Sequence, residues 1–329
     1  MENARVPLIL FTGFLGSGKT TVLNDALTQL RDRRVAVVVN EWGKLPVDGA
    51  LLKDPSGLGV VEVAGGQIFC SCVSGSFLSA LERLVALGAE MILVETSGLA
   101  KPATLGELAA EAEKRNGGIL RYRGLVCVVD ALRFGRLRSV ALAVNEQVRF
   151  ADRFVITKAD LASESALQET IDTLQSLRPA VPWALRRGEA MDLEKIIPSF
   201  ADGSSMVKKV EPFDPQWSGW GLGGSPASDS IVPAGGVEKS RLESFLQRLS
   251  PETFRIKGFV YTPMDTEPLL VDCVEETINL TAWEGGDGRA IQGGLAIIWK
   301  KQAPSREKLL ELWTSITATE GRLLDAPVH

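Results

Sequence analysis

A glycine-rich segment near the N-terminus could bind phosphate. It is GFLGSGKT over residues 13–20, which fits the pattern G-x-x-x-x-G-K-[ST]. Glycines let the backbone curl so that successive N–H groups point inward at an anion. The pattern predicts a nucleotide phosphate loop, with Lys19 on the β- and γ-phosphates and the Thr20 hydroxyl on Mg²⁺. The other expected contacts of this loop are Gly13, Gly16, Ser17, Gly18 and Thr21. The alternative is a glycine-rich turn without a ligand.

Acidic residues follow two later apolar runs. Glu41 and Asp48 come soon after VVV at 37–39, and Glu95 ends the run from 91 to 94. Carboxylates that leave a strand near a phosphate loop can reach Mg²⁺ or its waters, because this ion prefers oxygen ligands. For Glu41 and Asp48 the alternative is a solvated loop charge. Glu95 has the place of a Walker B carboxylate, which holds Mg²⁺ through water or orients the attacking water. Gly98 is expected to offer its N–H to the γ-phosphate and to act as a hinge.

A third segment concerns the base of the nucleotide. Thr157, Lys158 and Asp160 follow an apolar run in the order T-K-x-D, which resembles the N-K-x-D signature of GTPases. An aspartate there accepts hydrogen bonds from guanine N1–H and N2–H₂, which adenine lacks, and such a site rejects the analogue strongly. The stem of Lys158 can lie over the base. Thr157 replaces an Asn that contacts N7, which is an acceptor on both purines. The loss of this Asn should therefore weaken nucleotide binding more than it alters the choice between guanine and adenine.

The elements that position these motifs are indicated by apolar runs that alternate with amphipathic stretches. The expected strands are Pro7–Thr12, Arg34–Asn40, Gly59–Val63, Glu90–Glu95, Gly124–Val129 and Phe154–Thr157. The expected helices are Lys19–Arg31, Ser76–Leu87, Leu105–Lys114 and Val144–Ala151. Residues 163–200 favour one more helix, a short strand at Trp183–Leu185 and a closing helix. This order is typical of an α/β fold with a parallel sheet covered by helices on both faces.

A composition change near Gly203 indicates a boundary. Residues 214–237 are rich in Gly, Ser and Pro, so 203–237 is predicted to be a flexible linker between a domain at 1–202 and one at 238–329. The second domain is predicted to be a small α+β module. Its expected helices are 238–249 and 305–316, and its expected strands lie at 254–262, 269–283 and 295–301.

Composition excludes several classes of function. The chain has 329 residues, 45% of them hydrophobic, and a net charge of −5, which argues against non-specific nucleic-acid binding. No apolar run approaches the length of a membrane span. The one histidine, His329, excludes chemistry that needs a histidine base or cluster. Four cysteines do not make a secreted disulfide framework at this length, so we expect a cytoplasmic protein.

Taken in order, the motifs resemble the CobW family of P-loop GTPases, relatives of the nickel-insertion GTPases of hydrogenase and urease maturation. The matching stretches are GFLGSGKTT (13–21), VVNEWG with VDG (38–49), ETSGLAKP (95–102), VVDA (128–131), EQVRFADRFVITKADL (146–161) and FRIKGFV (254–260). The resemblance covers nearly the whole chain, including the C-terminal domain of that family. It implies a GTPase whose hydrolysis is coupled to handling a metal ion or a metal cofactor such as a corrinoid.

The family's C-x-C-C motif is incomplete here. Cys70 and Cys72 match its first two cysteines, and Val73 stands where the third would be. Two thiolates cannot close a four-coordinate zinc site, so water, a carboxylate such as Glu41 or a second chain's cysteines would complete it. An open thiolate site suits transient capture of soft metals. The alternative is two small residues packed in a turn, and a disulfide between them is disfavoured.

We therefore predict a GTPase with Lys19, Glu95 and Gly98 in catalysis. Its cofactors are GTP or GDP and Mg²⁺, and its cargo is Zn²⁺, Co²⁺ or a corrinoid. Turnover should be slow, because no arginine finger is identifiable. The expected partner is a client metalloenzyme or corrinoid protein, with a homodimer as a further expectation. The alternatives are a nucleotide-dependent docking module without metal and a P-loop kinase acting on a small molecule.

Overall fold

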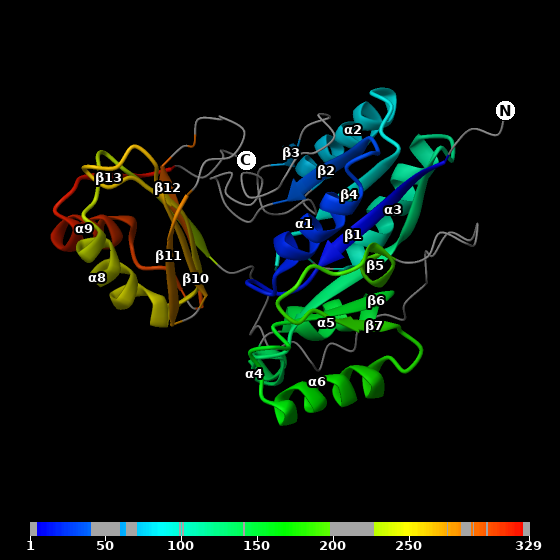
Figure 1. The fold of residues 1–329 in the computed structure, drawn as a ribbon. Helices are drawn as coiled ribbons and strands as arrows, with labels where there is room; N and C mark the ends of the chain where they lie inside the picture. The colour runs from blue at the N-terminus through cyan, green and yellow to red at the C-terminus, as the bar shows by residue number, and fades with distance from the viewer. Residues whose placement is uncertain are drawn as a thin grey trace. The chain divides into compact units, whose positions relative to one another are not determined.

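The chain forms two compact units, each built around one sheet (Figure 1). The computed structural model describes residues 5–40, 60–63, 71–98, 100, 102–140, 142–197, 227–274, 276–283, 291, 293–300 and 302–324. In the described part, no helix is long and apolar enough to cross a membrane.

The first unit contains a seven-stranded parallel sheet in the order β3-β2-β4-β1-β5-β6-β7. Its strands are β1 Val6–Thr12, β2 Val35–Asn40, β3 Val60–Val63, β4 Met91–Glu95, β5 Leu120–Asp130, β6 Arg153–Thr157 and β7 Trp183–Leu185. Side chains of the central strands are buried on both faces, which explains why these strands are nearly continuous apolar runs. Because β1 lies between β4 and β5, the ends of these three strands meet at one edge of the sheet.

Helices cover both faces of this sheet. They are α1 Lys19–Gln29, α2 Ser71–Ala86, α3 Pro102–Arg115, α4 Phe134–Val140, α5 Leu142–Phe150, α6 Glu164–Leu177 and α7 Leu193–Ile196. On one face, α2 and α3 contribute Phe77, Leu81 and Leu105 to a core with the strands. On the other face, α1 contributes Val22 and Leu23 to a second core. This arrangement confirms the predicted α/β fold with a parallel sheet between helical layers.

The second unit contains a six-stranded sheet whose neighbours are all antiparallel, in the order β11-β10-β9-β12-β8-β13. Its strands are β8 Ser228–Pro233, β9 Thr253–Val260, β10 Leu269–Val274, β11 Thr277–Ala282, β12 Gly294–Trp299 and β13 Gly321–Leu323. Helices α8 Lys239–Leu249 and α9 Arg306–Thr317 pack on it, and a short 3₁₀ turn, Ser250–Glu252, follows α8. The rings of Phe245 and Trp313 meet edge to face at 4.9 Å between these helices.

The structure differs from the sequence-based expectation in several elements. Strand β8 lies inside the range 203–237 that was predicted as linker, because pairing with β12 and β13 orders this Ser- and Pro-containing segment. The run 269–283 is not one strand but the hairpin β10–β11. Helix α4 and strand β13 were not predicted, since both are short. The closing helix expected within 163–200 is reduced to the four residues of α7.

Candidate functional site

The loop between β1 and α1 has a backbone that only glycine adopts easily. Gly16 and Gly18 have φ values of 74° and 92°, in the left-handed region, and Gly13 has a φ of 143°. A Cβ at Gly13 would clash with the carbonyl oxygen of Val128 and lie 2.7 Å from Ser17 Oγ. Gly18 caps α1 without a side-chain hydrogen bond. The N-terminal end of α1 therefore begins directly after a glycine-rich turn, which is an arrangement that suits an anion.

Polar groups inside this loop are buried and suited to a phosphate. The Lys19 ammonium donates hydrogen bonds to the carbonyl oxygens of Gly13 at 2.9 Å and Phe14 at 3.4 Å, and the residue is 5% exposed. The Ser17 hydroxyl is buried and has no hydrogen-bond partner among the described residues. A buried hydroxyl without a partner is costly in a folded protein, so a ligand oxygen beside it would relieve that cost. The loop thus fits a phosphate group.

A hydroxyl and a carboxylate meet next to the loop. Thr20 Oγ1 donates to both carboxylate oxygens of Glu95, at 3.0 and 3.1 Å. Glu95 is the last residue of β4 and is 3% exposed, and its register partner in β1 is Phe11. Strand pairing therefore places this carboxylate beside the start of α1. Hydroxyl and carboxylate oxygens together fit a hard divalent cation such as Mg²⁺.

Gly98 lies against the phosphate loop. A Cβ at this position would approach the backbone nitrogen of Leu15 to 2.7 Å, so a side chain there would push into the loop. The carbonyl oxygen of Gly98 accepts a 3.0 Å hydrogen bond from the amide of Gln147 in α5. The turn after β4 is thus held in contact with the loop after β1, and Gly98 belongs to the same site as Lys19.

The T-K-x-D segment also reaches the loop. Thr157 Oγ1 donates to the carbonyl oxygen of Ser17 at 2.6 Å and to that of Val129 at 3.2 Å. Lys158 Nζ donates to the carbonyl oxygen of Gly16 at 2.8 Å. The end of β6 is therefore attached to the phosphate loop by two side chains.

Asp160 is exposed and faces the turn after β7, since a Cβ at Gly188 would lie 3.4 Å from its Oδ2. That turn is attached to α1, because Arg186 Nε pairs with Asp25 Oδ2 at 2.8 Å. The structure thus places the carboxylate expected to choose the base at the end of β6, beside a turn that the phosphate-loop helix holds in place. Thr21 is exposed at the start of α1.

Three residues of this site were not predicted from the sequence. Asp130, the last residue of β5, pairs with Lys158 Nζ at 2.6 Å, and Asp25 and Arg186 form the ion pair described above. Asp130 could have been found because it ends an apolar run next to the phosphate loop. Asp25 and Arg186 give no comparable pattern, because 161 residues separate them.

Part of the predicted metal chemistry lies outside the described residues. Glu41, Asp48 and Cys70 are outside the described residues. Cys72 lies in α2, but its side chain is not described. In the described part, no group of three or more His, Cys, Asp or Glu residues could hold a metal ion.

The other two cysteines, Cys127 and Cys273, are buried core residues. Burial raises the pKa of each thiol from 9.0 to about 12. The Lys19 ammonium lowers the pKa of Cys127 in part. At Cys273 the Asp272 carboxylate adds to the rise in pKa, while a backbone hydrogen bond at Asn279 and the Arg255 guanidinium offset part of it. Both thiols therefore stay protonated and unreactive near neutral pH.

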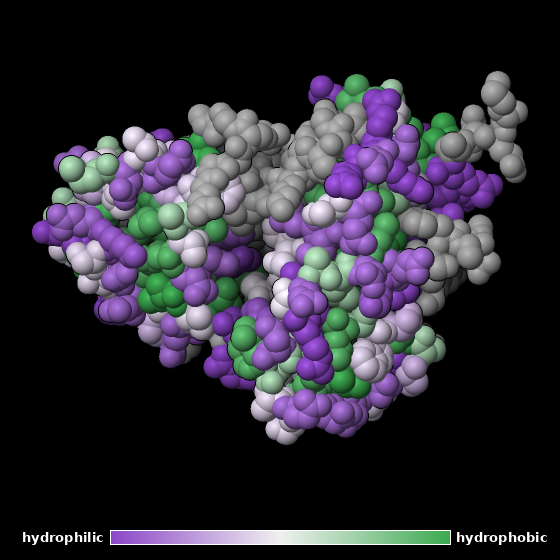
Figure 2. All heavy atoms as spheres, in the orientation of Figure 1, coloured by the Kyte–Doolittle hydropathy of each residue, from purple (hydrophilic) through white to green (hydrophobic). Residues whose placement is uncertain are grey.

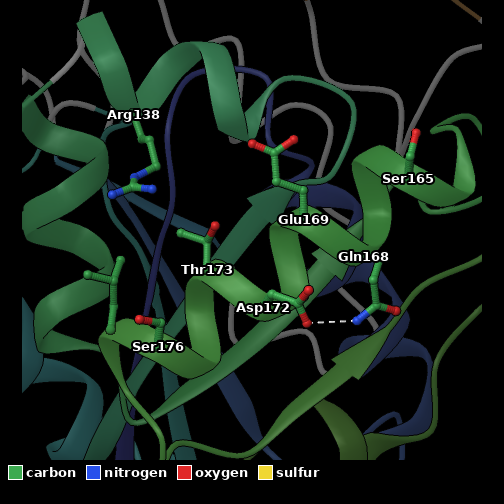
Figure 3. Close-up of a pocket in the computed structure, with 8 residues that line it drawn as sticks. Arg138, Ser165, Gln168, Glu169, Asp172, Thr173 and Ser176 are labelled. Atoms are coloured by element: carbon green, nitrogen blue, oxygen red, sulfur yellow. Dashed lines mark hydrogen bonds between the residues drawn. The ribbon is translucent and has the colours of Figure 1, made fainter.

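A small hollow and a larger one are lined by described residues of the first unit. A cavity of about 20 Å³ lies beside the phosphate loop and is lined in part by Phe14, Ser17, Cys127, Asp130 and Gln147. A larger and open hollow of about 570 Å³ lies over α6 and the end of α4 (Figure 3). The surface over α6, at the bottom of Figure 2, is largely hydrophilic, and none of the described residues that line this hollow is a predicted site residue.

Comparisons with known proteins give matches in both units of the chain. The family model for the CobW/HypB/UreG nucleotide-binding domain matches residues 7–184, and that for the cobalamin synthesis protein cobW C-terminal domain matches residues 227–313. A protein named zinc chaperone CobW from Sinorhizobium is 26% identical, over 88% of this chain and 91% of its own length.

Two further relatives match over shorter regions. A zinc chaperone CobW from Pseudomonas aeruginosa is 39% identical over 39% of this chain and 34% of its own length. The Escherichia coli zinc chaperone YjiA is 28% identical over 53% of this chain and 56% of its own length. The crystal structure of Zn(II)-bound YjiA superposes on 95% of this chain and 99% of its own, with 19% identity and a TM-score of 0.46.

Proposed function

Since the chain belongs to the CobW/HypB/UreG family of nucleotide-binding domains, followed by a CobW C-terminal domain, we propose that it is a GTPase that delivers a metal ion to a client protein. The observation that carries the proposal is the meeting of Lys19, Ser17 and the Thr20–Glu95 pair around one loop. These groups supply what phosphoryl transfer to water requires, namely a cation, anion-binding donors and oxygen ligands for a divalent ion.

Phosphate binding is assigned to the loop backbone and to Lys19. The ammonium, held by the carbonyl oxygens of Gly13 and Phe14, lies within the loop before any ligand arrives. This preorganisation lowers the cost of stabilising charge that develops as the γ-phosphate leaves. Ser17 supplies a further donor.

The Thr20–Glu95 pair would hold Mg²⁺. When bound, the ion neutralises charge on the phosphates and orients the reacting groups. Glu95 would retain its place at the end of β4 and position water beside the γ-phosphate, while Gly98 brings the following turn to the loop. Among the described residues, the geometry identifies no arginine that would stabilise the transition state. We therefore expect intrinsic GTP turnover to be slow.

Guanine selectivity is assigned to Asp160, with Lys158 over the base. Thr157 has the place of the usual Asn, and its hydroxyl holds the phosphate loop instead. The base segment, residues 157–160, therefore stays attached to the phosphate loop although it lacks the asparagine amide. Base choice depends on the carboxylate of Asp160, which adenine cannot satisfy.

The cargo we propose is Zn²⁺ rather than Co²⁺ or a corrinoid. The relatives with the greatest coverage and identity described above are named zinc chaperones. Thiolates of Cys70 and Cys72 suit this ion, and two thiolates leave coordination positions open for transfer. Cys70 comes just before α2 in the sequence and Cys72 belongs to the first turn of that helix, in the same domain as the nucleotide loop. Nucleotide state controls cargo affinity if GTP and GDP stabilise different forms of this segment.

The receiving protein is proposed to be a metalloenzyme, and Glu41 and Asp48 remain candidate ligands for Mg²⁺ or for the cargo. A homodimer would be one source of additional thiolates. The protein is proposed to work in the cytoplasm, where thiols are kept reduced.

The proposal is tested by titrating Zn²⁺ into the protein loaded with GDP or with a non-hydrolysable GTP analogue. We expect stoichiometric zinc binding whose affinity differs about tenfold or more between the two states, and loss of this binding in Cys70→Ser with Cys72→Ser. The matched control is Cys273→Ala, which removes a buried thiol of the second unit and should leave zinc binding unchanged. Nucleotide binding without zinc binding would favour a docking module, and equal zinc affinity in both states would contradict coupling.

A further inference from the structure

One buried carboxylate of the site has no assigned role. Asp130 ends β5 and is 5% exposed. Its Oδ2 pairs with Lys158 Nζ at 2.6 Å, and its Oδ1 accepts a 3.0 Å hydrogen bond from the backbone N–H of Leu132. A carboxylate that is buried to this extent is stable only when both oxygens have partners. The Asp130 carboxylate is therefore held in place by its ion pair with the Lys158 ammonium and by the Leu132 N–H.

The same ammonium connects three parts of the site. Lys158 Nζ also donates to the carbonyl oxygen of Gly16 in the phosphate loop, at 2.8 Å. Asp130 is the register partner of Thr157, the residue before Lys158, so the carboxylate lies on the neighbouring strand. The end of β5, the base segment and the phosphate loop thus meet at one nitrogen atom.

Lys158 needs such an anchor. Its backbone has a φ of 55°, in the left-handed region that a residue with a side chain adopts only under local constraint. Its side chain has four rotatable bonds and is 26% exposed, so without a partner it would sample many rotamers. An ammonium fixed at both Asp130 and Gly16 holds the stem in one path beside the loop before a nucleotide binds.

We propose that Asp130 is a positioning residue for the nucleotide, which acts by holding Lys158. The proposal rests on the proposed function, because it assumes that a guanine nucleotide binds along the loop and the T-K-x-D segment. Asp130 preorganises the site, and preorganisation mainly lowers the ordering cost of binding. Loss of the Asp130 carboxylate should weaken the binding of GTP and of GDP by a similar factor. The preference for GTP over ATP should stay, because Asp160 is untouched.

The test is a double-mutant cycle on the dissociation rate of a fluorescent GDP, measured by stopped flow. The variants are Asp130→Asn, Lys158→Met and the two combined. Hydrogen bonds to charged groups in proteins are strong enough that we expect Asp130→Asn to speed dissociation about tenfold. If Asp130 acts through Lys158, the double variant dissociates no faster than Lys158→Met alone. Fully additive effects, or an unchanged rate in Asp130→Asn, would overturn the proposal.

The matched control is Asp152→Asn. Asp152 is also a buried carboxylate of the first unit, 8% exposed, and its Oδ2 accepts a 2.9 Å hydrogen bond from the backbone N–H of Leu125. We expect this variant to lower the melting temperature but to leave GDP dissociation unchanged. Equal acceleration by both substitutions would mean a general loss of packing and would overturn the positioning role.

Two further outcomes are separable. If Asp130→Asn does not fold, Asp130→Glu replaces it in the cycle, because it keeps the charge and displaces it by one methylene. Its acceleration of GDP release must then vanish in the Lys158→Met background, and persistence would overturn the proposal.

If the unmodified protein binds no guanine nucleotide, the proposed function fails and the role of Asp130 fails with it. Tight GDP binding with no effect of Asp130 overturns this inference alone.

Discussion

The hydroxyl of Thr157 donates a 2.6 Å hydrogen bond to the carbonyl oxygen of Ser17, which joins residues 140 positions apart in the sequence. One of these residues belongs to the base segment and the other to the phosphate loop. A second hydrogen bond from the same hydroxyl reaches Val129 in β5. Thr157 is therefore a structural link between the two halves of the candidate site, and not only a substitute for a residue that contacts the base.

Thr157→Val tests this link. The variant keeps the shape of the side chain but leaves the Ser17 carbonyl without its donor, so we expect a loss of about 1–3 kcal/mol in unfolding free energy. Calorimetry should show GTP binding weakened about tenfold, with the preference for GTP over ATP retained.

The control for that variant is Thr170→Val. Thr170 is also buried, and its hydroxyl donates to the Ala166 carbonyl within α6. This substitution should change stability without changing GTP affinity. If Thr157→Val binds GTP as the unmodified protein does, the link has no role in binding.

Gly98→Ala tests the contact between the turn after β4 and the phosphate loop. The added methyl would meet the Leu15 backbone, so we expect GTP turnover and GTP affinity both to fall about tenfold or more. Gly106→Ala is the matched control. Nothing lies within 4 Å of a Cβ at Gly106, which is inside α3, so alanine there should stabilise the protein by about 0.5–1 kcal/mol. Normal turnover in Gly98→Ala would show that the turn can move away without cost.

Glu95→Gln tests the proposed metal and water chemistry. The amide oxygen can still accept the Thr20 hydrogen bond, so the fold should persist, but the charge beside the cation is lost. Single-turnover assays should show hydrolysis about 100-fold slower, while GDP binding without Mg²⁺ stays the same. Glu113→Gln, which changes a carboxylate that accepts from Tyr122 N, serves as the control. Hydrolysis at the original rate in Glu95→Gln would exclude a catalytic role.

The thiols give an independent test. Because the pKa of Cys127 and Cys273 is raised to about 12, neither should react with a thiol reagent at pH 8 in the folded protein. The raised pKa also means that stability from these thiols is present below pH 9 and is lost as pH rises toward 12. We expect Cys70 and Cys72 to react and Zn²⁺ to protect them, and unfolding to expose all four thiols. Rapid labelling of Cys127 in the folded protein would contradict its placement.

Much of the first unit could be predicted because its central strands are buried on both faces. A strand such as β4 must then be apolar throughout, and its polar end, Glu95, stands out in the sequence. The phosphate loop was equally visible, since Gly13, Gly16 and Gly18 carry backbone angles that other residues avoid. At these positions the residue type itself determines the backbone structure. The contacts expected between the phosphate loop and Glu95 then follow from the order of the strands in the sheet.

Other features depend on contacts between distant segments and could not be predicted. Strand β8 contains Ser228 and Pro233, which favour a loop, and becomes a strand because β12 and β13 pair with it. The Asp25–Arg186 ion pair leaves no local pattern, because neither residue belongs to a motif. Asp130 was visible as a strand end, but its partner Lys158 could be identified only after β5 and β6 were paired.

Isothermal titration of the folded protein with GTP, GDP and ATP in the presence of Mg²⁺ tests the central claim most directly. We expect one guanine-nucleotide site per chain and ATP binding weaker by about 100-fold or more, with Asp160→Asn reducing that preference. Equal affinity for GTP and ATP would contradict the assignment of Asp160. No uptake of GTP or GDP would contradict the account as a whole.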